Sequence, residues 1–416
     1  MKTIIPLIVL AIFIFSDLYV YFFYYKSLIK NIIGRILFFL PSIILLGGIF
    51  ILGNMSADGD LFFRKYQSYF LLASLFFVIP KLLFMLFSIL DRLTRWVFRS
   101  RKFRFFTYIG ILVAFAGIYV LIKGTWFDRD RLEIKYISIF SDKIPDGFCK
   151  FRILQISDLH LGNLVNKEKT VSELVLVINE EKPDMIVITG DLVNQYAKEL
   201  DGLESLFAGM KAEKGIFSIL GNHDYADYVQ WESKEAKAEN LEQLIKKQQD
   251  FGWIVLKNEA TIIHKGSDSL AVIGVENWGE PPFSVYGNLD QAMQSVENIS
   301  FKVLLTHNPT HWEKEVVGKK DIFLTFSGHT HAMQLLFKAV GMNISPASLK
   351  YKYWKGLYTE NEDQYLHVNL GIGYVGVPFR FGARPEISII ELNCKSKKEE
   401  PAVTVTDVVN EETISN

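Results

Sequence analysis

The chain has 416 residues, of which 50% are hydrophobic and 22% are charged, and its formal net charge is −1. This composition is too apolar for a single soluble globule and excludes a disordered chain, and the balanced charge gives no reason to expect a nucleic-acid partner. The two cysteines, Cys149 and Cys394, exclude a disulfide-rich scaffold and a cysteine-based zinc cluster but leave one disulfide open.

The first 124 residues contain four apolar runs, each close to the ~20 residues that a helix needs to cross the hydrocarbon core. These runs cover residues 3–24, 31–53, 68–90 and 105–122. The first run is longer than a signal-peptide core and lacks a small-residue cleavage site, so we expect it to be retained. The sequence therefore predicts a transmembrane anchor of four helices over residues 1–124.

Charged residues in this region bear on its placement in the membrane. Lys81, next to Pro80 in the third run, should either face a partner or water inside the membrane or mark a kinked helix end with its amine at the interface. Other lysines and arginines gather in the loops after the first and third runs, which the positive-inside rule puts in the cytoplasm. The part that follows the fourth run is then expected outside the cytoplasm.

From residue 125 onward, short apolar runs typical of strands alternate with helical stretches. This alternation predicts an α/β fold with a mostly parallel sheet. Its strands are expected at Ile153–Ile156, Met185–Thr189, Ile216–Leu220, Val303–Thr306 and Ile322–Phe326, and its helices at 167–181 and 198–212.

Later apolar runs have no long helices between several of them, which predicts a second, more antiparallel sheet. They lie at 260–264, 270–275, 365–369 and 386–392. We expect the folded domain to extend over residues 125–394. The remaining residues, 395–416, are rich in Glu, Lys, Thr and Val without aromatics and predict a disordered tail.

Residues that can carry chemistry follow each of the five strands expected in the parallel sheet. They are Ser157-Asp158-Leu159-His160, Gly190-Asp191-Leu192-Val193-Asn194, Gly221-Asn222-His223-Asp224, His307, and Gly328-His329-Thr330-His331. Because ligands bind outside the carboxyl ends of strands in such a sheet, we expect these side chains to meet at one edge. Oxygen and nitrogen donors without thiolates suit Mn, Fe or Zn, and a pair of such metals is a known solution for displacement at phosphorus.

In this order, the blocks D-x-H, G-D-x-x-[DN], G-N-H-[DE], a single His and G-H-x-H resemble the calcineurin-like metallophosphoesterase superfamily over about residues 131–393. The strand and proline-containing turn at Ile134–Gly147 and the segment at 377–387 are similar to its membrane-associated bacterial branch. The resemblance implies a two-sheet α/β (αββα) domain and a metal-dependent phosphoric ester hydrolase. Together with the charge bias, it predicts an integral protein of the bacterial inner membrane with an extracytoplasmic catalytic domain.

Motif by motif, the resemblance also implies two divalent metal ions. The first ion would be bound by Asp158, His160 and His331, the second by Asn222, His307 and His329, and Asp191 would bridge the two. A hydroxide between the ions would be the nucleophile toward a phosphodiester, pyrophosphate or phosphomonoester. His223 would act on the leaving group as general acid or transition-state donor. Asp224 would orient His223, or would instead cap the following turn.

The chain departs from the branch at two places. Ala332-Met333-Gln334 stands where the branch often has Gly-Gly-Gln, so side chains there are expected to narrow the substrate cleft. Asn194 stands where many relatives have Asp, and it would either tune a metal ligand or bond to its own loop backbone.

Several other residues admit two interpretations. Arg380 and Arg384 could meet a substrate phosphate or pair within their loop with Glu386. The aromatic stretch Trp278–Tyr286 could cover the cleft or pack as an ordinary loop, and we favour packing. His311 is expected to open a helix rather than to act in the site.

Anchoring brings a cleft near the bilayer, so we expect a phosphate-ester substrate that is lipid-linked or derived from the cell envelope. The alternative is a membrane sensor or transport-associated protein that uses the phosphoesterase fold as a regulatory domain, with Lys81 as its supporting feature. The soluble half shows no basic patch interleaved with aromatics, so no nucleic acid is expected as a partner.

Overall fold

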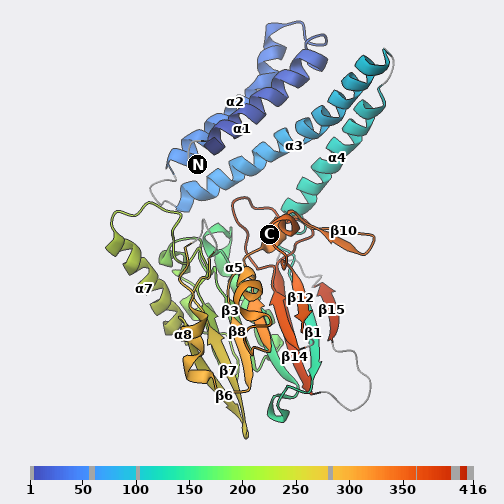
Figure 1. Cartoon of the computed structure of the whole chain (residues 1–416). Coiled ribbons are helices and arrows are strands. Elements are labelled where there is room, and N and C mark those ends of the chain that lie inside the picture. The colour runs from blue at the N-terminus through green and yellow to red at the C-terminus, as the bar shows by residue number, and fades with distance from the viewer. Residues whose placement is uncertain are drawn as a thin grey trace. The chain divides into compact units, whose positions relative to one another are not determined.

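A computed structural model of the chain describes residues 4–55, 61–99, 104–279, 284–361, 363–394 and 403–409 (Figure 1). The chain forms two compact units. Unit 1 contains Met1–Phe127 together with the later segment Gly376–Phe381, and unit 2 contains Asp128–Val375 and Gly382–Asn416.

The described part of unit 1 is built from apolar helices. They are α1 (Ile4–Val20), continued by a π-helical turn at Tyr21–Tyr25, α2 (Ile32–Met55), α3 (Leu61–Phe98) and α4 (Phe105–Trp126). Three of them contain stretches long and apolar enough to cross a membrane, at Ile32–Ile51, Tyr66–Phe98 and Phe105–Trp126. The first helix is a shorter apolar one over Leu10–Tyr25, so the described residues hold three helices of spanning length and one shorter helix where we expected four.

The lysine in the third predicted run has a partner. Nζ of Lys81, on α3, lies 2.5 Å from Oδ1 of Asp17, on α1, and the Asp17 residue is 3% exposed. The ammonium also lies over the rings of Phe38 and Phe77. Of the two interpretations, the one in which Lys81 faces a partner is therefore confirmed.

Unit 2 contains a seven-stranded mixed sheet in the order β15-β1-β14-β2-β3-β4-β5. Strands β2 to β5 are parallel neighbours, whereas β14 runs parallel to β1 and antiparallel to β2, and β15 is antiparallel to β1. The strands are β1 (Glu133–Ser141), β2 (Phe151–Ile156), β3 (Met185–Thr189), β4 (Ile216–Ile219), β5 (Ile254–Val255), β14 (Glu386–Cys394) and β15 (Val403–Val409).

A second, six-stranded sheet has the order β12-β13-β9-β8-β7-β6. Its inner pairs are parallel and its two outer pairs are antiparallel. The strands are β6 (Glu259–Lys265), β7 (Asp268–Gly274), β8 (Phe301–Leu305), β9 (Leu324–Ser327), β12 (Gly356–Glu360) and β13 (Gln364–Val368). A separate hairpin pairs β10 (Phe337–Ala339) with β11 (Met342–Ile344).

Successive side chains of each strand point to opposite faces of its sheet. Both faces carry apolar side chains, so the two sheets can pack against each other on one face and against helices on the other. Ile153 and Phe217 of the seven-stranded sheet pack with Val303 and Phe326 of the six-stranded sheet. The outer faces are covered by helices: α5 (Lys167–Glu180) and α7 (Lys234–Asp250) pack on the first sheet, and α8 (Leu289–Met293) packs on the second. The result is the layered two-sheet core that the resemblance implies.

Several expected features are wrong. Val303–Thr306 and Ile322–Phe326, expected in the parallel sheet, lie in the second sheet as β8 and β9, while 386–392 lies in the first sheet as β14. The helix expected at 198–212 is limited to a 3₁₀ turn and the short α6 (Glu204–Phe207), because Gly202 between them has a φ of +83°.

The C-terminal tail also differs from the prediction where the structure describes it. Val403–Val409 forms β15, which pairs with Glu133–Ile139 of β1, so a disordered tail is wrong for this segment. Residues 395–402 and 410–416 lie outside the described residues.

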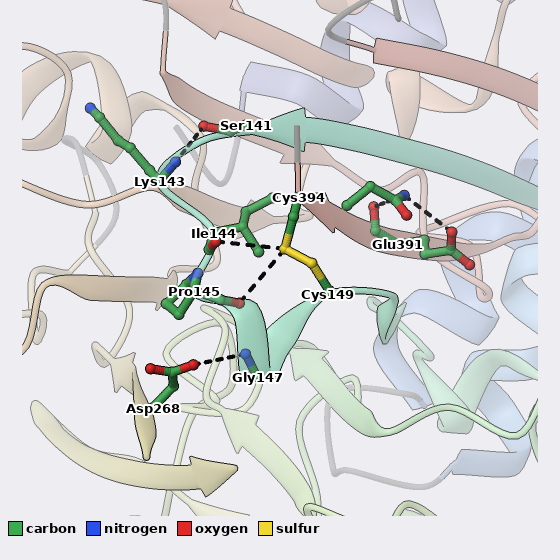
Figure 2. Close-up of a disulfide and its surroundings, with 10 residues drawn as sticks. Ser141, Lys143, Ile144, Pro145, Gly147, Cys149, Asp268, Glu391 and Cys394 are labelled. Atoms are coloured by element: carbon green, nitrogen blue, oxygen red, sulfur yellow. Dashed lines mark hydrogen bonds between the residues drawn. A yellow bond between two sulfur atoms is a disulfide. The ribbon is translucent and has the colours of Figure 1, made fainter. Parts of the chain in front are cut away.

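The disulfide that the sequence left open is present between Cys149 and Cys394 (Figure 2). Cys149 follows the 3₁₀ turn Asp146–Phe148 just before β2, and Cys394 is the last residue of β14. The two positions are 245 residues apart, so the bond closes a loop that contains every candidate site residue.

We expect that breaking the ion pair between Lys81 and Asp17 destabilises unit 1. Lys81→Met leaves the Asp17 carboxylate buried without a cation, at a cost of about 3 kcal/mol. The melting temperature of the detergent-solubilised full chain should fall in the single variant and recover in Asp17→Asn/Lys81→Met. Lys26→Met, at an exposed position, is the matched control, and an unchanged melting temperature in Lys81→Met would contradict the prediction.

Candidate metal centre

The candidate residues lie in the loops that follow five strands, β2, β3, β4, β8 and β9. Several of these loops hold non-glycine residues in left-handed backbone, a conformation that costs about 1–3 kcal/mol for such residues. The positive φ angles belong to Asp158 (50°), His160 (45°), Asp191 (54°), His329 (71°) and His331 (48°). Strain of this kind, gathered at one place, is typical of functional sites.

The first group of side chains contains Asp158, His160 and His331, whose donor atoms all lie within 4.8 Å of one another. Nε2 of His331 is 3.2 Å from Oδ1 of Asp158 and 3.2 Å from Nε2 of His160. The hydroxyl of Ser157 donates to Oδ2 of Asp158 and so leaves Oδ1 facing the histidines. All three residues are at most 5% exposed.

The second group is centred on His307. Its Nδ1 donates to the carbonyl of Thr189 at 2.7 Å, which directs Nε2 into the centre. This Nε2 lies 3.2 Å from Oδ2 of Asp191, 3.1 Å from Oδ1 of Asn222 and 3.1 Å from Nδ1 of His329.

Asp191 belongs to both groups. The atom of Asp191 that faces His307, Oδ2, is also 3.6 Å from Nε2 of His160. Its other oxygen, Oδ1, accepts the backbone N–H of His223 at 2.8 Å. The two groups are therefore joined by one carboxylate, and together they can hold metal ions at adjacent positions.

Burial and mutual charge set the protonation of the centre. Burial alone would raise the pKa of Asp158 and of Asp191, but the neighbouring histidines lower each pKa by more than burial raises it. The net shift is downward, so both carboxyls stay ionised well below neutral pH. Burial also lowers the pKa of His160, and that of His329 to about 3, so both rings are neutral. For His307 the effect of Asp191 outweighs burial and raises the pKa to about 10.

His223 lies beside this centre at a cavity of about 410 Å³. Nδ1 of His223 is 3.0 Å from the carbonyl oxygen of Asn194. A carbonyl can only accept, so Nδ1 carries the proton of this hydrogen bond, and Nε2 is the ring nitrogen left to exchange a proton with another group. The cavity is also lined by Tyr228, Met333, Gln334, Tyr351 and Val375.

Asp224 does not orient the ring of His223, which corrects the first of its two predicted roles. Its carboxylate accepts backbone N–H groups from Asp191 at 2.8 Å, from Gly221 at 2.8 Å and from Val193 at 3.2 Å. The side chain thus ties the loop after β3 to the loop after β4. Burial, with the charge of Asp191 adding to it, raises the pKa of Asp224 to about 7.

Asn194 contacts a candidate ligand rather than only its own loop. Its Oδ1 lies 3.0 Å from Nδ1 of His160 and 3.0 Å from Nδ2 of Asn163. A neutral amide therefore holds the far side of the His160 ring, in the position from which a partner orients a metal-binding histidine.

Two tyrosines that the motifs did not indicate also touch the centre. The hydroxyl of Tyr351 lies 3.0 Å from Nε2 of His329, and that of Tyr228 accepts from Nδ2 of Asn222 at 2.8 Å. Tyr351 is 22 positions from His329 in a different loop, so the motif spacing carried no signal for it.

The remaining candidates lie elsewhere. His311 is buried, bonds to Thr306 and Glu315 and stacks on Trp278, which agrees with a structural role and with packing of the aromatic loop. The part of that loop at 280–283 lies outside the described residues.

The partners that the structure gives the two late arginines include groups other than Glu386. Nε of Arg384 donates to Asp128, and Glu386 pairs with Lys135. Arg380 lies in the segment that belongs to unit 1, where its backbone N–H donates to the carbonyl of Gly124. Arg384 is not among the described residues that line the cavity.

Two family models match the chain. The model described as calcineurin-like phosphoesterase matches residues 151–333, and that described as probable calcineurin-like phosphoesterase, transmembrane domain, matches residues 1–129. The first match contains every predicted metal ligand together with His223 and Asp224, and the second contains the four described helices of unit 1.

The chain is also similar to curated proteins from several organisms. It is 27% identical over 333 residues to a transmembrane protein with metallophosphoesterase domain from Danio rerio, covering 76% of this chain and 71% of the relative. It is 29% identical to an uncharacterized metallophosphoesterase of Aquifex aeolicus (64% and 93% covered) and 29% identical to the uncharacterized metallophosphoesterase YkuE of Bacillus subtilis (64% and 87%). The chain therefore combines a calcineurin-like phosphoesterase domain at residues 151–333 with a transmembrane domain of the kind associated with such phosphoesterases at residues 1–129.

Proposed function

We propose that the chain is a membrane-anchored phosphoesterase that uses two divalent metal ions to hydrolyse a phosphodiester, pyrophosphate or phosphomonoester. The observation that carries this proposal is the junction at Asp191, where one buried carboxylate lies within 3.6 Å of ring nitrogens from both donor groups. A single-metal or structural site would not need two such groups side by side.

The donor set fits two cations. His160 and His331 direct ring nitrogens at each other 3.2 Å apart, as do His307 and His329 at 3.1 Å, and each pair can share only one proton. A cation between each pair would instead accept a lone pair from both rings. Without a metal, Asp191 stabilises a proton on His307, and this proton supplies positive charge at the site. A bound cation would take the place of that proton, which agrees with the general rule that metal binding releases protons.

In the proposed reaction, the two donor groups that share Asp191 would hold two divalent cations, which would make a water molecule nucleophilic at neutral pH and would neutralise charge on the phosphoryl oxygens. The side chains of the protein would position the cations and supply the proton for the leaving group. Asp158 and Asp191 provide carboxylate oxygens that stay ionised, and the loops after β2 and β3 fix them in left-handed backbone. Nε2 of His223 protonates the leaving oxygen, while the carbonyl of Asn194 holds its Nδ1–H.

The membrane half is proposed to be an anchor of four helices over residues 1–124, including the shorter first helix. Lys81, the feature that favoured a sensor or transport role, is accounted for by its ion pair with Asp17. If the membrane half is only an anchor, Lys81→Met protein that remains folded should keep its catalytic activity. If it is a sensor coupled through Lys81, the same variant should lose regulation of that activity.

The catalytic domain is proposed to lie outside the cytoplasm of a bacterial inner membrane and to act on a lipid-linked or envelope phosphate. Two observations support this orientation. Lysines and arginines gather in the loops expected inside, and the disulfide between Cys149 and Cys394 is of a kind that persists in oxidising compartments.

Asp191→Asn should abolish hydrolysis, because it removes the charge that both donor groups share. We expect the full chain in detergent to lose activity by roughly 100-fold or more and to retain less Mn²⁺ after gel filtration, measured by elemental analysis. Chelation should inactivate the wild type and Mn²⁺ should restore it. His264→Gln, at an exposed position on β6, is the matched control, and full activity in Asp191→Asn would exclude the dinuclear mechanism.

The role of His223 is tested by the leaving group. His223→Gln should slow hydrolysis of an alkyl phosphate ester by about 10²–10⁴-fold, because an alkoxide needs a proton as it departs. A 4-nitrophenyl ester, whose leaving group needs little protonation, should be affected much less. Equal losses with both esters would show that His223 acts in another way.

The orientation is tested by the state of the two cysteines in intact cells. After acid quenching and denaturation, the wild-type chain should react with a maleimide polymer only once a reductant has been added, because both thiols are in the disulfide. Cys149→Ser, which leaves Cys394 free, is the control that reacts without reductant. Modification of both wild-type thiols without reductant would place the domain in the cytoplasm.

A further inference from the structure

The hairpin of β10 and β11 forms a sheet of its own that pairs with neither of the larger sheets. In Figure 1 it projects from the sheets of unit 2 at the label β10. Phe337 pairs with Ile344 and Ala339 pairs with Met342, so these four side chains share one face. Lys338 and its partner Asn343 lie on the other face, and the hairpin is therefore amphipathic.

The apolar residues of this hairpin are exposed. Val340 at its tip is 96% exposed, Met342 is 61% exposed and Ile344 is 52% exposed. Leu349, shortly after the hairpin, is 91% exposed. Two-stranded hairpins have little stability of their own in water, and a continuous exposed apolar surface marks an interaction site.

The turn gives independent evidence that the tip serves an interaction. Val340 has a φ of 49° and Gly341 a φ of 75°, the two positive values of a type I′ turn. Asn, Asp or Gly is favoured at the first of these positions, whereas a β-branched residue there is strained. This strained valine is almost fully exposed, so its side chain packs on neither the turn nor the core and is available for contact with another surface.

The charge around the hairpin favours a lipid surface as its occupant. Lys338 lies on the polar face of the hairpin, and Lys350 and Lys352 follow Leu349. Apolar side chains next to lysines are the pattern of elements that enter the boundary between lipid headgroups and acyl chains, where the cations meet anionic headgroups.

Within unit 2, contacts connect the hairpin to the segment at which the chain enters this unit from its transmembrane domain. The root residue of the hairpin, Leu336, has its carbonyl against the backbone of Gly382, and the N–H of Gly382 donates to Asp128 at 3.0 Å. Asp128 follows Trp126, the last residue of α4, by two positions. The root of the hairpin is thus fastened to the point where the chain leaves its transmembrane domain.

We propose that the hairpin Phe337–Ile344 inserts its apolar face and the Val340 tip into the surface of the bilayer in which the chain is anchored. Residues that line the cavity at the metal centre flank this hairpin on both sides, Met333 and Gln334 before it and Tyr351 after it. As far as the proposed function holds, the inserted hairpin presents the cavity to phosphates at the membrane surface.

Insertion is tested by the depth of a fluorophore at the tip. The full chain with Val340→Cys, labelled with an environment-sensitive dye and reconstituted in nanodiscs that contain anionic lipid, should show blue-shifted emission and several-fold stronger quenching when the lipids carry a spin label on the acyl chain. The matched control is Leu176→Cys, an exposed position on α5, whose dye should remain unquenched.

Equal, weak quenching at both positions would overturn the proposal. A blue shift at Val340→Cys that depends on protein concentration and not on the spin-labelled lipid would overturn it as well, because it would show that a second copy of the chain covers the hairpin. Neither readout needs catalysis, so failure of the proposed function would leave this test intact.

The consequence for substrate choice has its own test, which rests on the proposed function. Met342→Asp should hydrolyse a water-soluble ester at the wild-type rate but a phosphate ester embedded in the nanodisc several-fold more slowly. An equal rate on the embedded ester would show that the hairpin does not present the cavity to lipid. Absence of turnover of any ester by the wild type would instead refute the phosphoesterase proposal.

Discussion

Unit 2 depends on burying two carboxylates next to each other. Asp158 and Asp191 are at most 2% exposed, and two buried negative charges would be strongly destabilising if nothing compensated them. Histidine ring nitrogens lie 3.2 Å from each carboxylate and supply that compensation. The proposed metal ligands are therefore also part of what allows the loops after β2 and β3 to pack, so folding and the site cannot be separated. The same principle applies in unit 1, where Lys81 compensates a buried aspartate.

The positions of the strands could largely be predicted, because a run of apolar residues between turn residues indicates a buried strand from the local sequence alone. Met185–Thr189 was expected with its observed limits, and Ile216–Leu220 differs from β4 by one residue. The pairing of strands was not predictable in the same way. The runs that form β8, β9 and β14 look alike as sequence, and which sheet each one joins depends on partners that are far away in the chain.

At the candidate site, motif spacing identified the side chains that the fold brings together but not the groups that hold them. Asp224 was predicted either to orient its neighbour His223 or to cap the following turn, and its carboxylate accepts backbone N–H groups from two different loops. The ring of His223 is held by a backbone carbonyl, which no side-chain pattern records. Tyr351 reaches His329 because the chain between them loops out as the β10–β11 hairpin.

The position of β1 has a consequence for the order in which the protein can assemble. This strand is the first of unit 2 to be synthesised, but its two neighbours in the sheet are β14 and β15, the last two strands of the described chain. Its backbone hydrogen bonds on both edges must therefore wait for nearly the whole chain. Until then β1, which follows the last transmembrane helix in the chain by only a few residues, presents two open edges, so pairing of the C-terminal strands completes the assembly of this sheet.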